Sequence, residues 1–302
     1  MSAQRDDPSP AAAGAAGFPG AGVDALPPPA MARKAEDIGR TKAELGAANT
    51  FALAVLAGAF IAMGAVFATT TIAGGDDLPF GVARLLAGVT FSLGLILVVV
   101  AGAELFTGNN LIVMAWASRR VSTLGLLRNW AIVYAGNFAG SVATAGLMYA
   151  TKQYTFAKGG VGAQALTIAA TKTGFDFWQA IALGILCNAL VCMAVWLCYS
   201  ARTTTDRILA IVPPIAAFVA SGFEHSVANM YFIPMGLFVK SDDSFLAANP
   251  DLPDLSGLTW GSFVVDNLIP VTIGNAIGGS ILVGALYWFV YLRPERGGRP
   301  DG

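Results

Sequence analysis

The sequence predicts an all-α membrane protein with six transmembrane helices arranged as two inverted three-helix repeats, with helices 2 and 5 broken. Three features predict this fold: an apolar composition, six apolar segments of membrane-spanning length, and an internal repeat. Of the 302 residues, 55% are hydrophobic and only 12% are charged. Soluble domains carry about 25% charged residues. The chain therefore requires an apolar environment around it.

Six apolar segments are long enough to cross a bilayer, which takes roughly 20 residues. The second and the fifth are too long for one straight crossing, and each has polar residues in its middle. The segments cover 48–73, 82–117, 124–150, 177–199, 208–239 and 262–292. A six-span transmembrane domain is therefore expected at 47–293.

The two ends of the chain differ from this domain. Residues 1–28 are rich in Ala, Pro and Gly and contain no continuous apolar run, which predicts a disordered tail without a secretory signal peptide. In 29–46, apolar residues recur at helical spacing among charged ones. This pattern predicts an amphipathic helix on the membrane surface or on the protein's own face. Residues 294–302 are expected to form a short tail.

An even number of crossings places both termini on the same side, and the charges indicate which side. Thirteen of the 18 Lys and Arg residues fall on the side of the termini, which predicts cytoplasmic termini and a cytoplasmic helix at 29–46. The other side holds Arg84, Lys152, Lys158, Lys172 and Lys240.

Composition also excludes several functions. The net charge is −1 and no basic run is present, so no nucleic-acid partner is expected. Cys187, Cys192 and Cys198 are spaced by five and six residues, which scatters them around a helix with no histidine nearby. They are interpreted as buried apolar residues, with no disulfide, no metal site and no cofactor.

Two motifs occur twice in the same order, three spans apart. Since an odd number of spans separates the copies, the second copy enters the membrane from the opposite side. Such inverted repeats place the functional site at the midplane. The glycines of the second motif have the spacing that lets helices pack closely. The pairs are Gly102-x-Glu104-x4-Asn109 with Gly222-x-Glu224-x4-Asn229, and Asn129-x6-Gly136-Asn137-x2-Gly140 with Asn267-x6-Gly274-Asn275-x2-Gly278.

The polar interruptions lie at 101–110 and 220–229. Non-helical backbone at membrane depth survives only when it is buried in protein or lines a wet cavity. Thr107 and Ser226 are expected to cap the half-helices that follow, whose N-termini would attract an anion. Glu104 and Glu224 are expected to hold the loops by accepting backbone hydrogen bonds.

His225 is the only histidine of the chain and lies in the second interruption. Ionisable residues inside a membrane are functional candidates, and histidine changes charge near physiological pH. A transport role is therefore predicted for the ring. An enzyme would need a second catalytic group within reach, and an ammonia pore would resemble proteins with twin histidines. Neither is favoured, and no catalytic residue is predicted.

Six longer motifs carry a resemblance to a known family. They resemble signatures of the formate/nitrite transporter family, in particular its formate channels, and the match runs from about residue 25 to residue 292. The motifs are Phe91-Ser-Leu-Gly-Leu-Ile-Leu97, Glu104-Leu-Phe-Thr107, Asn188-Ala-Leu-Val-Cys-Met-Ala-Val-Trp196, Ser221-Gly-Phe-Glu-His-Ser226, Asn229-Met-Tyr-Phe-Ile-Pro-Met-Gly236 and Asn267-Leu-Ile-Pro-Val-Thr-Ile-Gly-Asn275.

The resemblance implies an aquaporin-like protomer in a homopentamer, each protomer with its own pore, in the lipid bilayer of a bacterial inner membrane. The implied substrate is formate or a similar small monovalent anion. A nitrite or hydrosulfide channel of the same family is the alternative, since several such relatives also carry Gly-Asn where this chain has Gly108-Asn109. Acetate, and a proton symport in place of a channel, also remain open.

The resemblance also implies roles for single positions. Phe91, Leu95, Leu105 and Phe218 match hydrophobic constrictions, and Thr107 and His225 match the polar contacts between them. Lys172 matches a vestibule lysine, and Asn188 and Asn275 match lining amides. The amphipathic segment that ends near Lys42 resembles a cytoplasmic helix that covers the inner mouth.

Overall fold

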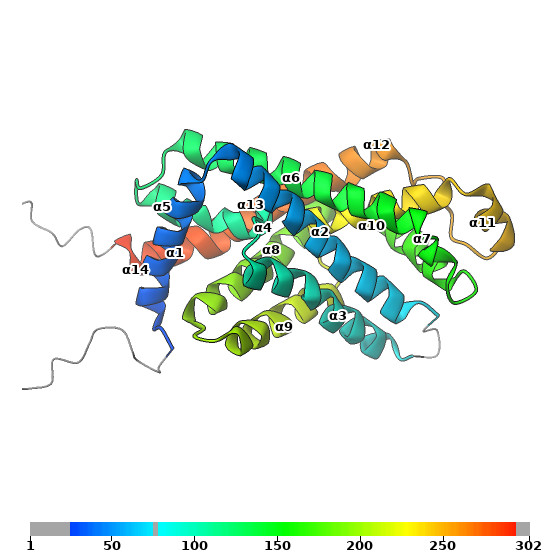
Figure 1. The fold of residues 1–302 in the computed structure, drawn as a ribbon, viewed down its shortest axis with the longest axis horizontal. Helices are drawn as coiled ribbons and strands as arrows, with labels where there is room; N and C mark the ends of the chain where they lie inside the picture. The colour runs from blue at the N-terminus through cyan, green and yellow to red at the C-terminus, as the bar shows by residue number, and fades with distance from the viewer. Residues whose placement is uncertain (1–24, 75–77, 294–302) are drawn as a thin grey trace, which may run out of the picture.

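The computed structural model describes residues 25–74 and 78–293, and all regular structure in these residues is helical (Figure 1). The expected disorder of 1–28 and the tail at 294–302 thus lie largely outside the described residues. The helices are α1 (Pro28–Glu44), α2 (Ala47–Ile72), α3 (Phe80–Ala101), α4 (Phe106–Asn109), η1 (Asn110–Ile112), α5 (Val113–Ala117), α6 (Thr123–Ala150), η2 (Gln153–Thr155), α7 (Gly160–Thr173), α8 (Phe177–Ser200), α9 (Thr204–Ala220), α10 (Ser226–Lys240), α11 (Asp243–Ala248), α12 (Trp260–Ser262), η3 (Phe263–Leu268), α13 (Ile269–Ile277), η4 (Gly278–Ala285) and α14 (Leu286–Tyr291).

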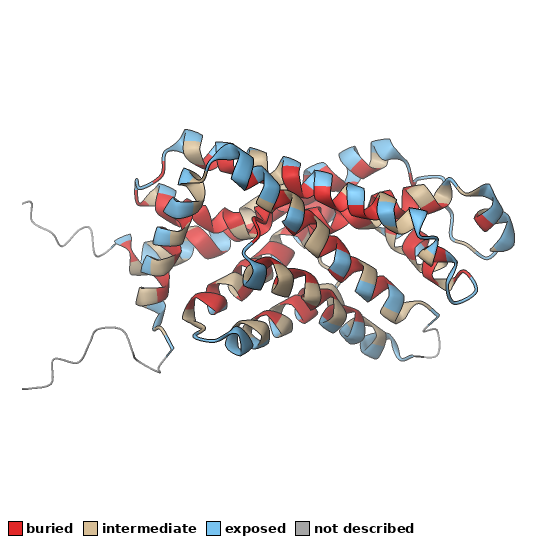
Figure 2. Cartoon of the chain, viewed as in Figure 1, coloured by how far each residue is buried: buried red, intermediate tan, exposed pale blue. Residues whose placement is uncertain are grey.

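Within residues 25–74 and 78–293, five helices are long and apolar enough to cross a membrane: α2, α3, α6, α8 and the continuous run α12–α14. Large apolar side chains such as Phe80, Leu124 and Trp178 lie on their outer surfaces, and buried residues concentrate in the interior (Figure 2). An apolar outer surface suits lipid contact. The prediction of an all-α membrane protein is confirmed.

The two predicted helix interruptions are present. The chain leaves helix after α3 and resumes at α4, and it leaves helix after α9 and resumes at α10. Gly102 and Gly222 end the first halves with φ angles of 82° and 75°. This left-handed conformation is costly for residues with a Cβ and suits glycine, which commonly ends helices in this way.

The repeated glycines pack helices against each other, as predicted. A Cβ added to Gly140 would overlap the carbonyl oxygen of Val55 in α2, and one added to Gly278 would overlap that of Ile185 in α8. Gly136 and Gly274 face the same two helices. Helix α6 on α2, and α13 with η4 on α8, are therefore held at a separation that leaves no room for a larger side chain.

Helix α1 packs on the protein's own face. Met31, Ala32 and Ala35 are buried in a cluster with residues of α8 and α14. Arg120, in the loop after α5, pairs with Asp37 of α1 at 2.6 Å. In Figure 1, α1 lies at one end of the long axis, with α5 and α14, whereas α7 and α11 lie at the other.

Candidate functional site

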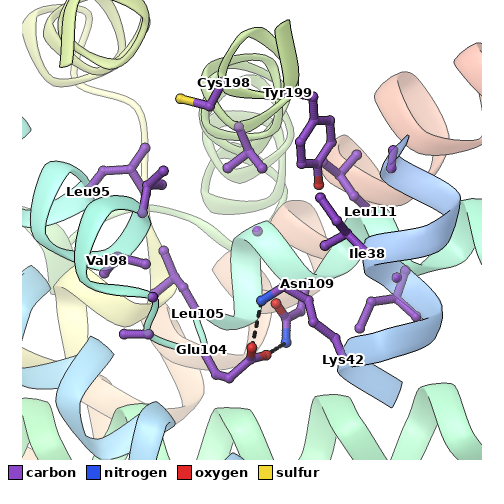
Figure 3. Close-up of a pocket in the computed structure, with 18 of the residues that line it drawn as sticks. Ile38, Lys42, Leu95, Val98, Glu104, Leu105, Asn109, Leu111, Cys198 and Tyr199 are labelled. Carbon is purple, nitrogen blue, oxygen red and sulfur yellow. Dashed lines mark hydrogen bonds and ion pairs between the residues drawn. The ribbon is translucent and has the colours of Figure 1, made fainter. Parts of the chain in front are cut away.

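Two cavities open toward opposite ends of the molecule, and they share no lining residue. The first, of about 360 Å³, is called the α1-side cavity, and Figure 3 shows it. The second, of about 230 Å³, is called the α7-side cavity. The α1-side cavity is lined mainly by residues of α1, α3, α4, α8 and the break at 102–105, and the α7-side cavity mainly by residues of α3, α7, α9, α10 and the break at 222–225.

Apolar side chains separate the two cavities. Leu95 and Leu105 face the α1-side cavity, and Phe91 and Phe218 face the other. All four are almost fully buried, and the rings of Phe91 and Phe218 meet edge to face with centroids 5.6 Å apart. The structure thus brings together, in one apolar cluster, the four residues that the resemblance assigned to constrictions. An unpaired charge in such surroundings is costly.

A polar contact lies beside this apolar barrier. His225 Nε2 is 3.0 Å from Thr107 Oγ1, and the backbone N–H of Ala228 donates to His225 Nδ1 at 3.1 Å. Because Nδ1 accepts this hydrogen bond, the proton of the neutral ring lies on Nε2 and is donated to Thr107. The ring therefore presents a single N–H donor toward the first half of the molecule.

The predicted helix caps are wrong. His225, not Ser226, is the N-cap of α10, and the Ser226 hydroxyl is buried without a partner among the described residues. Leu105 occupies the N-cap of α4, and Thr107 lies inside that helix and turns to His225. The backbone N–H groups of Ser226 and Ala228 are already occupied, so they are not free to bind an anion.

Two asparagines hold the broken backbone. Asn137 accepts from the N–H of Phe106 at 2.9 Å and donates to the carbonyl of Glu104 at 2.9 Å. Asn275 does the same in the other half, with Ser226 and Glu224, at the same two distances. Each amide also donates to a neighbouring span, at Ala54 in one half and Gly184 in the other.

Glu224 belongs to a buried network of side chains. Its carboxylate accepts from Lys172 Nζ at 2.7 Å and from Asn229 Nδ2 at 2.7 Å. Asn267 Nδ2 donates to the same carboxylate at 3.2 Å and to the carbonyl of Lys172 at 2.7 Å. Lys172 and Glu224 both line the α7-side cavity, so the lysine charge faces the cavity with its counter-charge beside it.

The α1-side cavity repeats this network with other residues. Lys42 Nζ donates to Glu104 Oε1 at 2.7 Å, and Asn109 Nδ2 donates to Glu104 Oε2 at 2.6 Å (Figure 3). Asn129 Nδ2 donates to the carbonyl of Lys42 at 3.1 Å. The expectation that Glu104 and Glu224 accept backbone hydrogen bonds is therefore wrong: both accept from lysine and asparagine side chains. Lys42 matches Lys172, and sequence reasoning missed it.

Asn188 lies behind the cavity walls. Like Asn275, it is fully buried and lines neither cavity. Its amide donates to Asn110 Oδ1 at 2.7 Å and to the carbonyl of Asn275 at 2.7 Å. The two asparagines that the resemblance assigned to the lining thus support the backbone that forms it.

Two arginines that sequence reasoning did not single out also line the cavities. Arg84 lines the α7-side cavity and donates to the carbonyls of Val219 at 2.6 Å and Ala220 at 3.2 Å, at the end of α9. Arg207 lines the α1-side cavity with Lys34. Both cavities are therefore cationic. Within the described residues, no group of three His, Cys, Asp or Glu is placed to hold a metal ion.

The Lys172–Glu224 pair allows a test of the network. Both side chains are largely buried, at 15% and 3% exposure. Substitution of Lys172 by Met leaves the carboxylate uncompensated, and we expect it to lower the free energy of unfolding by about 3–5 kcal/mol. The double variant with Glu224→Gln should recover part of that loss. Denaturation in detergent measures both values.

The exposed Arg40–Glu44 pair serves as the control. Its side chains are 52% and 60% exposed, so Arg40→Gln should cost no more than about 0.5 kcal/mol. A Lys172→Met variant as stable as Arg40→Gln would contradict the proposed energetic role of the buried pair.

Comparisons with known proteins agree with this geometry. The family model described as "Formate/nitrite transporter" matches residues 29–289. The "Formate channel FocA" of Escherichia coli (strain K12) is 47% identical over 273 residues, which cover 89% of this chain and 96% of that one. The protein of the same name from Haemophilus influenzae is 40% identical over 263 residues, covering 86% and 93%.

Two solved structures are similar as well. A pentameric formate channel with formate bound matches with a TM-score of 0.77 and 45% identity, covering 82% of this chain and 98% of that chain. An ion channel of the same family matches with a TM-score of 0.74 and 28% identity, covering 86% and 98%. The chain belongs to the formate/nitrite transporter family.

Proposed function

We propose that this protein is a channel for formate, a small monovalent anion. The observation that carries the proposal is the arrangement of two cationic cavities on opposite sides of one apolar barrier, with the Thr107–His225 contact beside it. Relatives named as formate channels, and a solved formate-bound channel, support the choice of formate.

Passage of an anion along this path depends on its attraction into the cavities and on its loss of hydration at the barrier. Formate, like other carboxylates, is ionised at neutral pH. The cations of each cavity raise the local anion concentration. At the barrier, the His225 ring stacks on that of Phe218 with centroids 6.0 Å apart, and its Nε2 lies 3.0 Å from the Thr107 hydroxyl. A hydrogen bond from either group would offset part of the loss of hydration.

The proposed topology is six crossings in two inverted repeats, an aquaporin-like protomer. The second crossing combines α3 with α4–α5, and the fifth combines α9 with α10. Two correspondences support a two-fold relation. Asn137 and Asn275 make the same hydrogen bonds to the broken backbone, and Glu104 and Glu224 bind the same types of side chain. We propose a homopentamer in a bacterial inner membrane, by analogy with the pentameric channel. The charge bias supports cytoplasmic termini.

A flux panel tests the substrate. In liposomes that contain the purified protein, formate should move well above the rate of protein-free liposomes and faster than nitrite or hydrosulfide. A membrane potential should drive a formate current, because an open channel carries the bare anion. Passage of nitrite or hydrosulfide without formate would overturn the substrate. Electroneutral uptake coupled to a proton would indicate symport.

Substitution of His225 by Phe tests the polar contact. The variant removes the Nε2–H donor, and loss of one hydrogen bond of about 1.4 kcal/mol corresponds to roughly a tenfold lower formate flux. The factor should be similar at pH 5 and pH 7, because the donor is the neutral ring, whose Nδ1 accepts from Ala228. Flux in liposomes at both pH values measures the effect.

The control for this prediction is Thr107→Val, which removes the partner hydroxyl and keeps the ring. It should lower flux to a similar extent at both pH values. A rate for His225→Phe equal to that of the unmodified protein at both pH values would exclude a role for the ring.

Cysteine labelling tests the topology, since the three native cysteines are buried. Ser244 in α11 and Thr205 in the first turn of α9 are both exposed. Arg207, two residues after Thr205, lines the α1-side cavity, and α11 lies at the end of the molecule opposite α1 (Figure 1). A membrane-impermeant maleimide should label Ser244→Cys in intact cells, and should label Thr205→Cys only after permeabilisation. The reverse pattern would invert the proposed orientation.

A further inference from the structure

Arg207 contributes a positive charge to the wall of the α1-side cavity. It lies in the first turn of α9, is partly buried, and lines the α1-side cavity. Among the residues that the structure describes, its guanidinium takes part in no hydrogen bond or ion pair. A guanidinium carries five N–H donors, so its capacity to bind an acceptor is unused.

Arg84 provides the contrast. It occupies a comparable position near the start of α3 and lines the other cavity, but its guanidinium is already bound to the carbonyls of Val219 and Ala220. The helix carbonyls therefore occupy the arginine of the α7-side cavity. The arginine of the α1-side cavity remains available to a ligand.

Lys34 adds a second positive charge beside Arg207. Its ammonium donates to the carbonyl of Tyr199 at 2.8 Å, a neutral acceptor. Burial, followed by the nearby charges of Arg207 and Arg202, lowers the pKa of Lys34 below its ordinary value of 10.5. No carboxylate contributes to this shift. Positive charge thus accumulates on this wall of the cavity.

The neighbouring carboxylates are engaged elsewhere. Glu104 is bound by Lys42 and Asn109, and Asp37 is bound by Arg120. Asp206 accepts the backbone N–H groups of Arg202 and Thr203. The charge at Lys34 and Arg207 is therefore not compensated by these acids. A partly buried cation without a counter-charge favours the binding of an anion.

We propose that Arg207, together with Lys34, forms a capture subsite for a monocarboxylate in the α1-side cavity, ahead of the barrier formed by Leu95 and Leu105. The planar guanidinium matches both oxygens of a carboxylate, which a lysine ammonium does not. The inference rests on the proposed function. It makes the two cavities unequal in their capacity to capture an anion. Capture assists influx from the α1 side alone, because Arg84 is committed to the backbone on the other side.

Flux measured from each side tests the subsite. In vesicles of known orientation, Arg207→Gln should raise the half-saturating formate concentration for influx from the α1 side about fivefold, with the maximal rate changed less than about twofold. Influx from the α7 side should keep its half-saturating concentration. Arg207→Lys should give a half-saturating concentration between those of the unmodified protein and Arg207→Gln, because it keeps the positive charge and loses the paired N–H donors of the guanidinium. Arg119→Gln, an exposed residue at the same end that lines neither cavity, is the control for net charge.

A binding measurement separates the subsite from transport. Phenylglyoxal modifies arginine, and formate should slow the modification of Arg207 in the purified protein while leaving that of Arg119 unchanged, as read by mass spectrometry. Protection of Arg207 without formate flux would refute the proposed channel and retain the subsite. Formate flux with Arg207 unprotected, and with Arg207→Gln behaving as Arg119→Gln, would refute the subsite and retain the channel.

Discussion

Backbone polar groups cannot remain unpaired inside a bilayer, and the site of this protein depends on how two side-chain amides meet that constraint. Each helix break exposes N–H and C=O groups whose burial without a partner costs several kcal/mol each. Asn137 and Asn275 each accept one N–H and donate to one carbonyl at a break, and each also binds a carbonyl of the adjacent span. A break whose backbone groups are hydrogen-bonded in this way can lie next to a cavity without requiring water to solvate those groups.

The two helix breaks, held by these amides, determine where polar and charged side chains lie along the path. The His225 ring uses Nδ1 to accept from Ala228, so its remaining nitrogen is the one directed at Thr107. Lys42 and Lys172 face the two cavities, and they are bound by Glu104 and Glu224 respectively. Each glutamate belongs to a helix break whose backbone is held by an asparagine amide. Strong charges therefore lie in the cavities, and the barrier itself contains apolar groups and one hydroxyl–imidazole contact. An anion is attracted at the mouths without being held at the centre, which suits conduction.

The sequence predicted these elements to different extents. The repeat located both breaks, and the glycine spacing predicted the packing at Gly140 and Gly278. The partner of Glu104 was hidden because the two halves differ in loop length: Lys42 precedes Glu104 by 62 residues, whereas Lys172 precedes Glu224 by 52. A search at fixed offset does not pair these lysines. The caps were wrong because residue type alone favours Ser226, whereas the backbone places His225 at the N-cap with its ring nitrogen in reach of the Ala228 N–H.

The two halves are similar but not equal, and the differences fall on the path itself. Leu105 and His225 both follow the glutamate of a break and both occupy an N-cap, yet one is apolar and the other carries the polar contact. An anion that arrives from the α1 side meets Arg207, whose guanidinium has no ion-pair partner in the described part of the chain, and then leucines. An anion from the other side meets Lys172, which Glu224 neutralises, and then aromatic rings. A passive pore has the same equilibrium from both sides, so these differences act on the concentration at which each mouth saturates. The differences between the two halves therefore set the direction-dependent behaviour of the pore.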